Sequence, residues 1–252
     1  MNEPDDRRPV VLVIAATDSS GGAGITRDVQ VLADFSADAL CVITAVTAQS
    51  DSQLTDIHHI PPEVIRAQIT AAFQTRQVDA IKIGMLGTRA TVDAVADSLP
   101  QSVSIPIVLD PVLMSSSGGV LLDAAGRDAM RKNLFPRAAL VTPNVPEAAA
   151  LLESGVADSE RVLIEQARSL LALGPQAVLV KGGHMSGGEA VDLLVSGSHG
   201  LERIASPRLF VVRRGTGCAL ASAIAAGMAS GMPLLEACRE AKRYVVEMLG
   251  RR

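Results

Sequence analysis

The sequence predicts an α/β fold with a mostly parallel, doubly wound central sheet and helices on both of its faces. Aliphatic and β-branched residues recur in continuous runs without alternation, which is typical of parallel strands covered on both faces. Segments with apolar residues three and four positions apart lie between these runs and indicate crossover helices. In this architecture, ligands bind at the carboxyl ends of the strands.

The expected elements follow one another in a regular order. Six buried strands are predicted at residues 9–17, 40–46, 80–85, 105–112, 138–144 and 176–183. Six helices are predicted among them, at residues 25–35, 63–74, 90–99, 124–134, 147–152 and 161–173. Segments 190–196 and 201–212 then predict an antiparallel β-hairpin. Two further helices, at 218–229 and 234–249, complete the chain.

A single domain is expected over residues 10–252, because the sequence contains no internal repeat and no low-complexity linker. The first nine residues are polar and acidic, so residues 1–9 are expected to form a flexible segment rather than a secretory signal. The stretch 219–235 is too short and too rich in Ala, Ser and Gly to span a bilayer. We therefore expect no membrane partner.

Charge and aromatic content narrow the class of ligand. The chain carries 23 basic and 27 acidic residues, and it has four Phe, one Tyr and no Trp. These numbers provide neither a broad phosphate-backbone footprint nor stacking platforms, so a small-molecule partner is expected and nucleic acid is not. The three cysteines form no C-x-x-C pair, which favours a reducing cytoplasmic location.

The segment Arg213 to Cys218, with the sequence R-R-G-T-G-C, leads two glycines and a threonine into a predicted helix. The free N–H groups of a first helical turn and the helix dipole can stabilise a phosphoryl group in transfer. Cys218 lies in that first turn, where a lowered thiol pKa would suit a base or polarising group. A glycine-rich helix start with a buried cysteine explains the same residues equally well.

A second glycine-rich turn, D-S-S-G-G-A-G at residues 18–24, follows the first strand. It does not match a dinucleotide fingerprint, because Arg27 stands where the third glycine is required, and G-K-[ST] occurs nowhere in the chain. The turn remains a candidate for contact with a substrate, with Asp28 one helical turn further along. Asp28 could equally be an exposed first-turn carboxylate favoured by the helix dipole.

Three more polar groups follow predicted strands. Asn144 and Glu147 lie three residues apart in T-P-N-V-P-E, a spacing that fits oxygen ligands of a hydrated Mg²⁺ ion and also a helix capping box. Asp110 is a second candidate for this metal region. Lys181, in K-G-G-H, could contact phosphates as a point charge or lie solvated in a turn. Because the carboxyl ends of parallel strands meet, these residues together favour phosphoryl transfer.

The chain resembles the hydroxymethylpyrimidine/phosphomethylpyrimidine kinases of thiamine biosynthesis, within the ribokinase-like superfamily, from about Val10 to Met248. The resemblance is carried by D-S-S-G-G-A-G-I-T-R-D (18–28), V-T-A-Q (46–49), I-K-I-G-M-L (81–86), D-P-V (110–112), T-P-N-V-P-E-A (142–148), K-G-G-H (181–184) and G-T-G-C (215–218). It implies a ribokinase-like fold, often a homodimer, and transfer of the ATP γ-phosphoryl to a hydroxymethylpyrimidine and then to its monophosphate.

The resemblance also implies roles for individual residues. Asp28 and Gln49 would hydrogen-bond the aminopyrimidine, and Met85 would pack against it. The backbone of Gly215, Thr216, Gly217 and Cys218 would form the anion hole, with Cys218 where related sugar kinases carry a catalytic aspartate. Lys181 would lie at the ATP phosphates, and Asn144 and Glu147 would organise Mg²⁺. From their positions at strand ends, Gly183 is also expected at the phosphates and Asp110 at the metal, with both carboxylates acting through water. The remaining expected substrate-site residues are Ala16, Asp18, Gly21, Val112, Arg213 and Arg214.

Three departures from the family pattern affect this site. Ala16-Thr17 stands in place of Gly-Ser, Ser116 in place of a lysine, and Arg213-Arg214 in place of Thr-His. One hypothesis is that an arginine here replaces the missing lysine as a phosphate ligand, since guanidinium binds phosphate oxygens as a fork. Neutral drift in a solvent-facing lid is the competing interpretation. Two alternative functions also stay open: a pyridoxal-type vitamin kinase, and a catalytically weak homologue that binds a pyrimidine as a sensor.

Overall fold

A computed structural model of the chain describes residues 7–50, 52–100, 105–115, 118–184, 188–198, 200–211 and 213–250. Within these ranges the strands are β1 (Val10–Asp18), β2 (Asp38–Gln49), β3 (Leu54–His59), β4 (Ala80–Ile83), β5 (Ile107–Leu109), β6 (Leu140–Val141), β7 (Ala177–Lys181), β8 (Glu189–Ser196) and β9 (Gly200–Pro207). The helices are α1 (Gly24–Asp34), α2 (Pro62–Thr75), α3 (Arg89–Ser98), α4 (Ala124–Asn133), α5 (Val145–Leu152), α6 (Glu160–Leu171), α7 (Thr216–Ala229) and α8 (Leu234–Gly250). Two short 3₁₀ turns lie at Phe135–Arg137 and Gly182–His184.

The described strands form a nine-stranded sheet in the order β3-β2-β1-β4-β5-β6-β7-β8-β9. The six strands from β2 to β7 in this order run parallel, and β3, β8 and β9 are joined by antiparallel pairing at the two edges. The predicted class, the six parallel strands and the closing hairpin are therefore confirmed.

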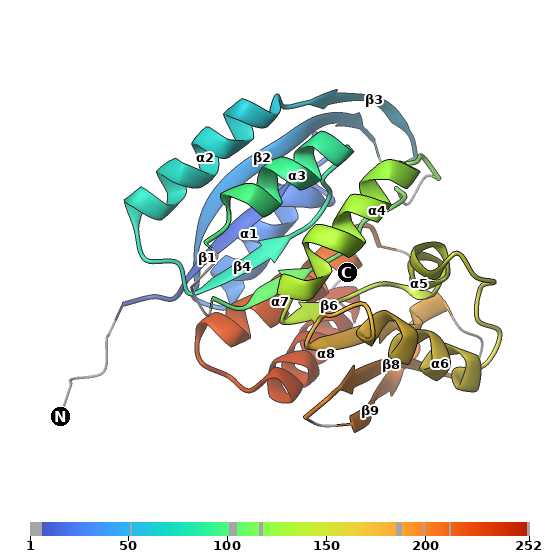
Figure 1. Cartoon of the computed structure of the whole chain (residues 1–252). Coiled ribbons are helices and arrows are strands. Elements are labelled where there is room, and N and C mark those ends of the chain that lie inside the picture. Colours follow the sequence, from blue (N-terminus) through green and yellow to red (C-terminus); the bar gives the residue numbers. More distant parts are fainter. Residues whose placement is uncertain are drawn as a thin grey trace.

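Two apolar layers cover the sheet (Figure 1). On one face, helices α2 to α6 pack against it around side chains such as Leu12, Ile14 and Ile83. On the other face, α1, α7 and α8 pack around Val11, Val13 and their neighbours. Successive residues of β1 thus point into different layers, because side chains of a strand alternate between the two faces. This burial on both faces explains why the strand sequences are continuously apolar.

The helices begin where the sequence provides a local signal. Thr88, Asp123 and Ser159 accept hydrogen bonds from backbone N–H groups of the first turns of α3, α4 and α6. α7 differs because Ala, Ser and Gly dominate it and every residue from Ala219 to Gly227 is buried. Its small side chains let it pack against α1, α8 and the sheet together. In the described part of the chain, no helix is long and apolar enough to cross a bilayer.

Strand β3 was not predicted. Its sequence, L-T-D-I-H-H, is polar and mostly exposed, so it has neither the apolar run nor the alternation that identifies a strand. It forms only because β2 offers its free edge for antiparallel pairing. The last predicted strand was also too long, since β9 ends at Pro207 and residues 208–211 leave the sheet.

Residues 1–9 were expected to form a flexible segment, and this expectation requires a correction at residues 7–9. Residues 1–6 lie outside the described ranges. Arg7 donates two hydrogen bonds to the Asp79 carboxylate, at 2.6 and 2.7 Å. The Pro9 carbonyl accepts a hydrogen bond from the Asp38 backbone at 2.8 Å. Residues 7–9 are therefore attached to the sheet ahead of β1.

Candidate active site

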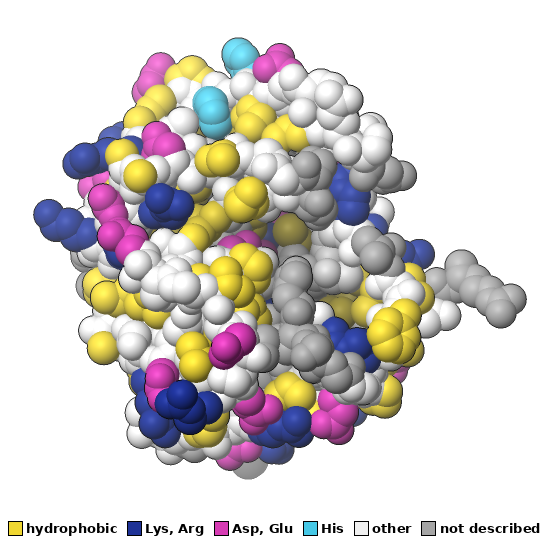
Figure 2. Space-filling model, turned by 90° about the vertical axis from the view of Figure 1, so that its right-hand side faces the viewer, with side chains coloured by type: hydrophobic (Ala, Val, Ile, Leu, Met, Phe, Trp, Pro, Cys, Tyr) yellow, Lys and Arg dark blue, Asp and Glu magenta, His cyan; other side chains and the backbone are white. Residues whose placement is uncertain are grey.

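A cleft of about 830 Å³ opens at the carboxyl ends of the parallel strands. Figure 2 shows the surface on this side of the molecule, where a hollow is bordered by hydrophobic side chains. Most of the predicted site residues line the cleft: Ala16, Asp18, Gln49, Met85, Asp110, Val112, Asn144, Glu147, Lys181, Gly183, Arg213, Arg214, Gly215, Thr216, Gly217 and Cys218. Gly21 and Asp28 are not among the lining residues. Segments separated by up to about 200 positions therefore meet here, as the carboxyl ends of parallel strands are expected to do.

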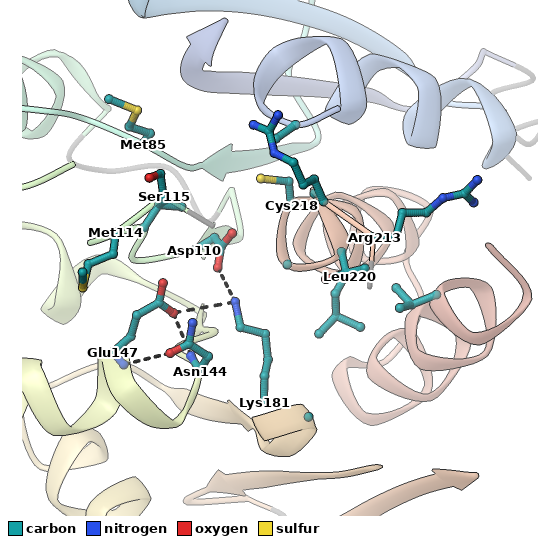
Figure 3. Close-up of a pocket in the computed structure, with 18 of the residues that line it drawn as sticks. Met85, Asp110, Met114, Ser115, Asn144, Glu147, Lys181, Arg213, Cys218 and Leu220 are labelled. Atoms are coloured by element: carbon teal, nitrogen blue, oxygen red, sulfur yellow. Dashed lines mark hydrogen bonds and ion pairs between the residues drawn. The ribbon is translucent and has the colours of Figure 1, made fainter. Parts of the chain in front are cut away.

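One wall of the cleft carries a lysine between two carboxylates. Asp110 directly follows β5, Lys181 ends β7, and Glu147 lies in the first turn of α5. The Lys181 Nζ donates to Asp110 Oδ1 at 2.7 Å and lies 3.9 Å from Glu147 Oε2. Figure 3 shows these side chains converging on one side of the pocket, with Cys218 on the opposite side. The arrangement holds one fixed cation among groups that can accept hydrogen bonds or bind a metal.

Asn144 and Glu147 form a complete capping box at the start of α5. Asn144 Oδ1 accepts a hydrogen bond from the Glu147 backbone at 2.8 Å, and Glu147 Oε2 accepts one from the Asn144 backbone at 2.7 Å. The structural interpretation of this spacing is therefore confirmed. It does not conflict with a role toward a ligand, because both residues also line the cleft.

Burial sets the protonation of this wall. It raises the pKa of Glu147 to about 7, against the opposing effect of Lys181 and with a further contribution from Asp110. Burial alone would lower the pKa of Lys181, but the charges of Asp110 and Glu147 outweigh it and raise that pKa. Lys181 is therefore an ammonium ion, while Glu147 titrates near neutral pH.

The oxygen ligands of this wall fit a hydrated magnesium ion. Asp110 and Glu147 provide two carboxylates from separate segments, and Mg²⁺ commonly takes only one or two protein carboxylates while it keeps several waters. Among the residues that the structure describes, no group of three or more His, Cys, Asp or Glu side chains could hold a metal by itself. The donor set thus suits an ion that arrives with its own water or phosphate ligands.

The N-terminus of α7 faces Lys181 across the cleft floor. Gly215 caps this helix in the left-handed conformation, with φ +74°. A Cβ atom added to Gly217 would lie 3.1 Å from Lys181 Nζ and 3.8 Å from Asp110 Oδ2. Backbone N–H groups of a first helical turn have no partner within the helix, so this end combines them with a nearby cation. The geometry suits a bound anion.

Cys218 requires a correction. It lies in the first turn of α7 and lines the cleft, as predicted, but its pKa is raised to about 11 rather than lowered. Burial is the main cause, and it outweighs the favourable effect of the Lys82 ammonium. The thiol is therefore neutral at pH 7 and can donate a hydrogen bond, but it is a poor general base.

Asp28 also requires a correction. It has no exposed surface, and its carboxylate is held below the cleft by Lys82 Nζ and Ser222 Oγ, each at 2.8 Å. It is therefore not an exposed carboxylate at a helix start, and it does not line the cleft, so its contact with the aminopyrimidine stays a prediction. The buried Asp28–Lys82 pair instead joins α1 to β4, and Ser222 adds α7.

Lys82 is a cleft residue that sequence reasoning missed. It is fully buried, yet part of its side chain reaches the cleft lining. Burial opposes its charge, but Asp28, Cys218 and Asp110 keep its pKa above the usual value. The available signal was a single lysine inside the buried strand A-I-K-I, since an unpaired charge is rarely tolerated there.

The two arginines before Gly215 make intramolecular contacts. Arg213 Nη1 donates to the Met248 carbonyl near the end of α8, and in Figure 3 its side chain extends away from Lys181. Arg214 binds Asp18, Ser20 and the Ser50 carbonyl. Neither contact favours the hypothesis of a replacement phosphate ligand. Ser116, the position of the missing lysine, lies outside the described residues.

An apolar group forms the end of the cleft next to the turn at residues 18–24. Ala16, Ala45, Met85 and Leu121 make a small buried cluster, with Val112 packed against it. Gln49, which ends β2, lines the same region. A flat apolar ligand with a polar edge would fit between these residues.

Comparisons with known proteins agree with this geometry. The family model described as phosphomethylpyrimidine kinase matches residues 18–252. A hydroxymethylpyrimidine/phosphomethylpyrimidine kinase of Rhizobium meliloti is 40% identical over 94% of this chain and 88% of its own length. A thiamine biosynthesis bifunctional protein of Geobacter sulfurreducens is 41% identical over 94% of this chain, which spans about half (48%) of that protein.

Two kinds of solved structure are similar to the whole chain. Phosphomethylpyrimidine kinase from Clostridium difficile has a TM-score of 0.83 at 33% identity, with 96% of this chain and 99% of that chain covered. Pyridoxal kinase from Staphylococcus aureus, in complex with AMP-PCP and pyridoxal, has a TM-score of 0.87 at 28% identity, with 96% and 88% covered. These neighbours share the ribokinase-like fold that the sequence predicts.

Proposed function

This chain belongs to the phosphomethylpyrimidine kinase family, and from that premise we propose that it transfers phosphoryl groups from ATP in thiamine biosynthesis. The acceptors are 4-amino-5-hydroxymethyl-2-methylpyrimidine and then its monophosphate. The observation that carries the proposal is the division of one cleft into a charged end, with Lys181 and the N-terminus of α7, and an apolar end around Met85. A phosphoryl donor and a flat heteroaromatic alcohol need these two environments.

At the charged end, the protein contributes positioning and electrostatic stabilisation. In the loose transition state of phosphoryl transfer, negative charge spreads over the transferred oxygens. The backbone from Gly215 to Cys218 offers N–H groups to that charge, and Lys181 adds a fixed ammonium near them. Gly183 follows Lys181 at the same edge, where the ATP phosphates would lie.

Asp110, Glu147 and Asn144 would hold Mg²⁺, the two carboxylates through water. The ion would neutralise the β- and γ-phosphate oxygens of the nucleotide. The wall residues support this role because Lys181 already keeps Asp110 in position, and the capping box holds Glu147. Glu147 must be ionised to contribute charge, and its pKa of about 7 allows this in neutral solution.

At the apolar end, Met85, Ala16 and Val112 would contact the faces of the pyrimidine, and Gln49 would hydrogen-bond its donor and acceptor edge. Asp18 and Gly21 belong to the turn that covers this end. Cys218 lies between the two ends, where its neutral thiol would donate a hydrogen bond to the reacting oxygens rather than remove a proton. Little basic assistance is needed when the transition state is loose.

Parallel assays of the purified protein test the proposal. The protein is given ATP and Mg²⁺ with hydroxymethylpyrimidine, its monophosphate or pyridoxal, and the phosphorylated products are separated by chromatography. Turnover of the two pyrimidines is expected. Turnover of pyridoxal alone would establish the vitamin-kinase alternative. The similarity of the fold to pyridoxal kinases is the reason for testing this substrate. Pyrimidine binding without turnover would leave the sensor alternative.

A homodimer and a cytoplasmic location complete the proposal. Support for the location comes from Cys41, Cys218 and Cys238, all of which are free thiols in the structure. Light scattering coupled to size exclusion, in reducing buffer, would report a mass of twice 26.2 kDa for the dimer. A mass near 26.2 kDa would contradict it.

A further inference from the structure

Arg214 connects three segments of the chain at the mouth of the cleft. Its guanidinium donates to Asp18 Oδ2 at 2.9 Å, to Ser20 Oγ at 3.0 Å and to the Ser50 carbonyl at 2.6 Å. The side chains of Arg214 and Asp18 are only 12% and 4% exposed. Arginine presents several N–H donors in a rigid plane, so one residue can join several acceptors that come from different segments.

These contacts fasten the turn at residues 18–24 to the start of α7. The second oxygen of Asp18 accepts hydrogen bonds from the backbone and hydroxyl of Ser20, both at 2.9 Å, so the carboxylate also shapes the turn itself. Beside the ion pair, a Cβ added to Gly215 would lie 2.2 Å from the Gly22 carbonyl oxygen. The two backbones are therefore in direct contact. Arg214 bridges the same contact, between the turn at residues 18–24 and the start of α7.

The end of β2 belongs to the same assembly. Ser50 accepts from Arg214, and the preceding Gln49 exchanges hydrogen bonds with Ser19, through its carbonyl at 2.8 Å and its N–H at 2.9 Å. Gln49 also lines the cleft. Three segments that line the cleft are thus connected through one arginine.

We propose that Arg214 is a positioning residue, which holds the turn at residues 18–24 and the end of β2 against the anion-binding start of α7. It acts through Asp18 and the backbone, and it is not a ligand of a substrate phosphate. Because its N–H donors are directed at three protein acceptors, binding a phosphate through these donors would break the contacts between the turn, the end of β2 and the start of α7. This proposal deepens the proposed function and rests on it for its kinetic test.

The two roles differ in their dependence on substrate charge. Hydroxymethylpyrimidine has no phosphate, whereas its monophosphate is a dianion. We expect Arg214→Ala and Asp18→Asn each to raise KM roughly tenfold for both pyrimidines, as loss of a charge-assisted hydrogen bond does, with KM for ATP changed less than about twofold. The double variant should be little worse than Arg214→Ala alone, because the contact between Arg214 and Asp18 is already absent from that variant. Arg214→Lys should restore part of the loss.

A loss at least tenfold larger for the monophosphate than for the alcohol would overturn the proposal and make Arg214 a phosphate ligand. Strictly additive effects in the double variant would also overturn it. The control is Arg161→Ala on α6, which removes an exposed i,i+4 ion pair with Glu165 and should leave all constants unchanged.

A second measurement does not require kinase activity. The backbone N–H groups of Ser20, Gly21 and Gly22 all make hydrogen bonds within the turn. Hydrogen–deuterium exchange by the intact protein should become roughly tenfold faster at these residues in Arg214→Ala, and unchanged in Arg161→Ala. Unchanged exchange in Arg214→Ala would refute the positioning role. If the wild-type protein phosphorylated neither pyrimidine, the proposed function would fail, while this exchange result would still decide whether Arg214 holds the turn.

Discussion

At the scale of single residues, burial changes the chemistry that residue type alone suggests. A cysteine in the first turn of a helix is expected to ionise easily, yet Cys218 has a pKa of about 11. A glutamate is expected to be charged at neutral pH, yet Glu147 titrates at about 7. In each case desolvation of the charged form outweighs the nearby positive charge. Such perturbed groups are typical of functional sites.

Cys218→Ala should lower kcat by a factor of about 10² while KM for ATP stays near its original value, because a hydrogen-bond donor to the reacting oxygens is lost. Cys218→Ser should retain more activity, since a hydroxyl can also donate. Steady-state kinetics from pH 6 to 10 provide the measurement. The wild-type profile should show no thiol titration below about pH 10; an inflection between pH 8 and 9 that disappears in the serine variant would restore Cys218 as a base.

Glu147→Gln should change how stability depends on pH. The folded-state pKa of about 7 exceeds the usual value of 4.5, so the wild-type protein loses stability as pH rises through this interval. Glutamine preserves the capping box without ionising. Urea unfolding at pH 5 and pH 8 measures the free energy of unfolding of both proteins. The value for the variant minus the value for the wild type should be larger at pH 8 than at pH 5, by about 3 kcal/mol at most. An equal difference at the two pH values would contradict the raised pKa.

At the scale of elements, the start of α7 depends on close approach between two backbones. Gly215 combines a left-handed conformation with the nearby Gly22 carbonyl, so both its φ angle and its missing side chain are required. The helix itself is predictable from its small residues, but this contact is not. A turn that follows β1 and a loop that precedes α7 meet only in the folded chain.

Gly215→Ala tests this contact against a matched glycine. Gly231 also has a left-handed φ, of +80°, but an added Cβ would meet nothing within 4 Å. Gly231→Ala should lose about 1 kcal/mol of unfolding free energy from backbone strain alone. Gly215→Ala should lose roughly 1–3 kcal/mol more unfolding free energy than Gly231→Ala does. It should also lower kcat, because the backbone N–H groups at the start of α7 would move. Equal losses in urea unfolding and unchanged turnover would show that the contact is unimportant.

At the scale of the whole molecule, one buried ion pair connects the sheet to the layer that contains α1 and α7. Asp28 comes from α1, Lys82 from β4 and Ser222 from α7, and none of the three has an exposed surface. A buried pair gains little over an apolar replacement, but removal of one partner leaves an uncompensated charge. Together with Ser222, the pair joins these three elements below the cleft.

Lys82→Met should destabilise the protein by about 3–5 kcal/mol, because Asp28 is left without its counter-charge. Adding Asp28→Asn should recover part of that loss, which makes the two effects non-additive. Arg161→Met, in an exposed ion pair of α6, is the control and should have little effect. A double-mutant cycle of unfolding free energies measures the coupling. Additive losses would mean that Asp28 and Lys82 do not stabilise each other.

Much of the architecture was predictable because its signals are local. The six parallel strands have apolar runs, and the crossover helices have a periodic apolar face. β3 was missed because pairing, rather than its own composition, makes it a strand. The positions of Lys181, Asn144, Glu147 and the α7 start were also predictable, since each follows a strand or opens a helix at the same edge of the sheet.

By itself, the sequence determined the order of strands and helices, the edge at which the polar groups gather, and the membership of a kinase family. Only the tertiary structure decided which charges meet and which are buried. Asp28 and Lys82 are 54 positions apart, and Asp18 and Arg214 are 196 apart, so no local pattern pairs them. The pKa of a side chain likewise depends on solvent exclusion and on charges from other segments. Periodicity is a property of neighbours along the chain, whereas protonation and positioning arise from neighbours in space.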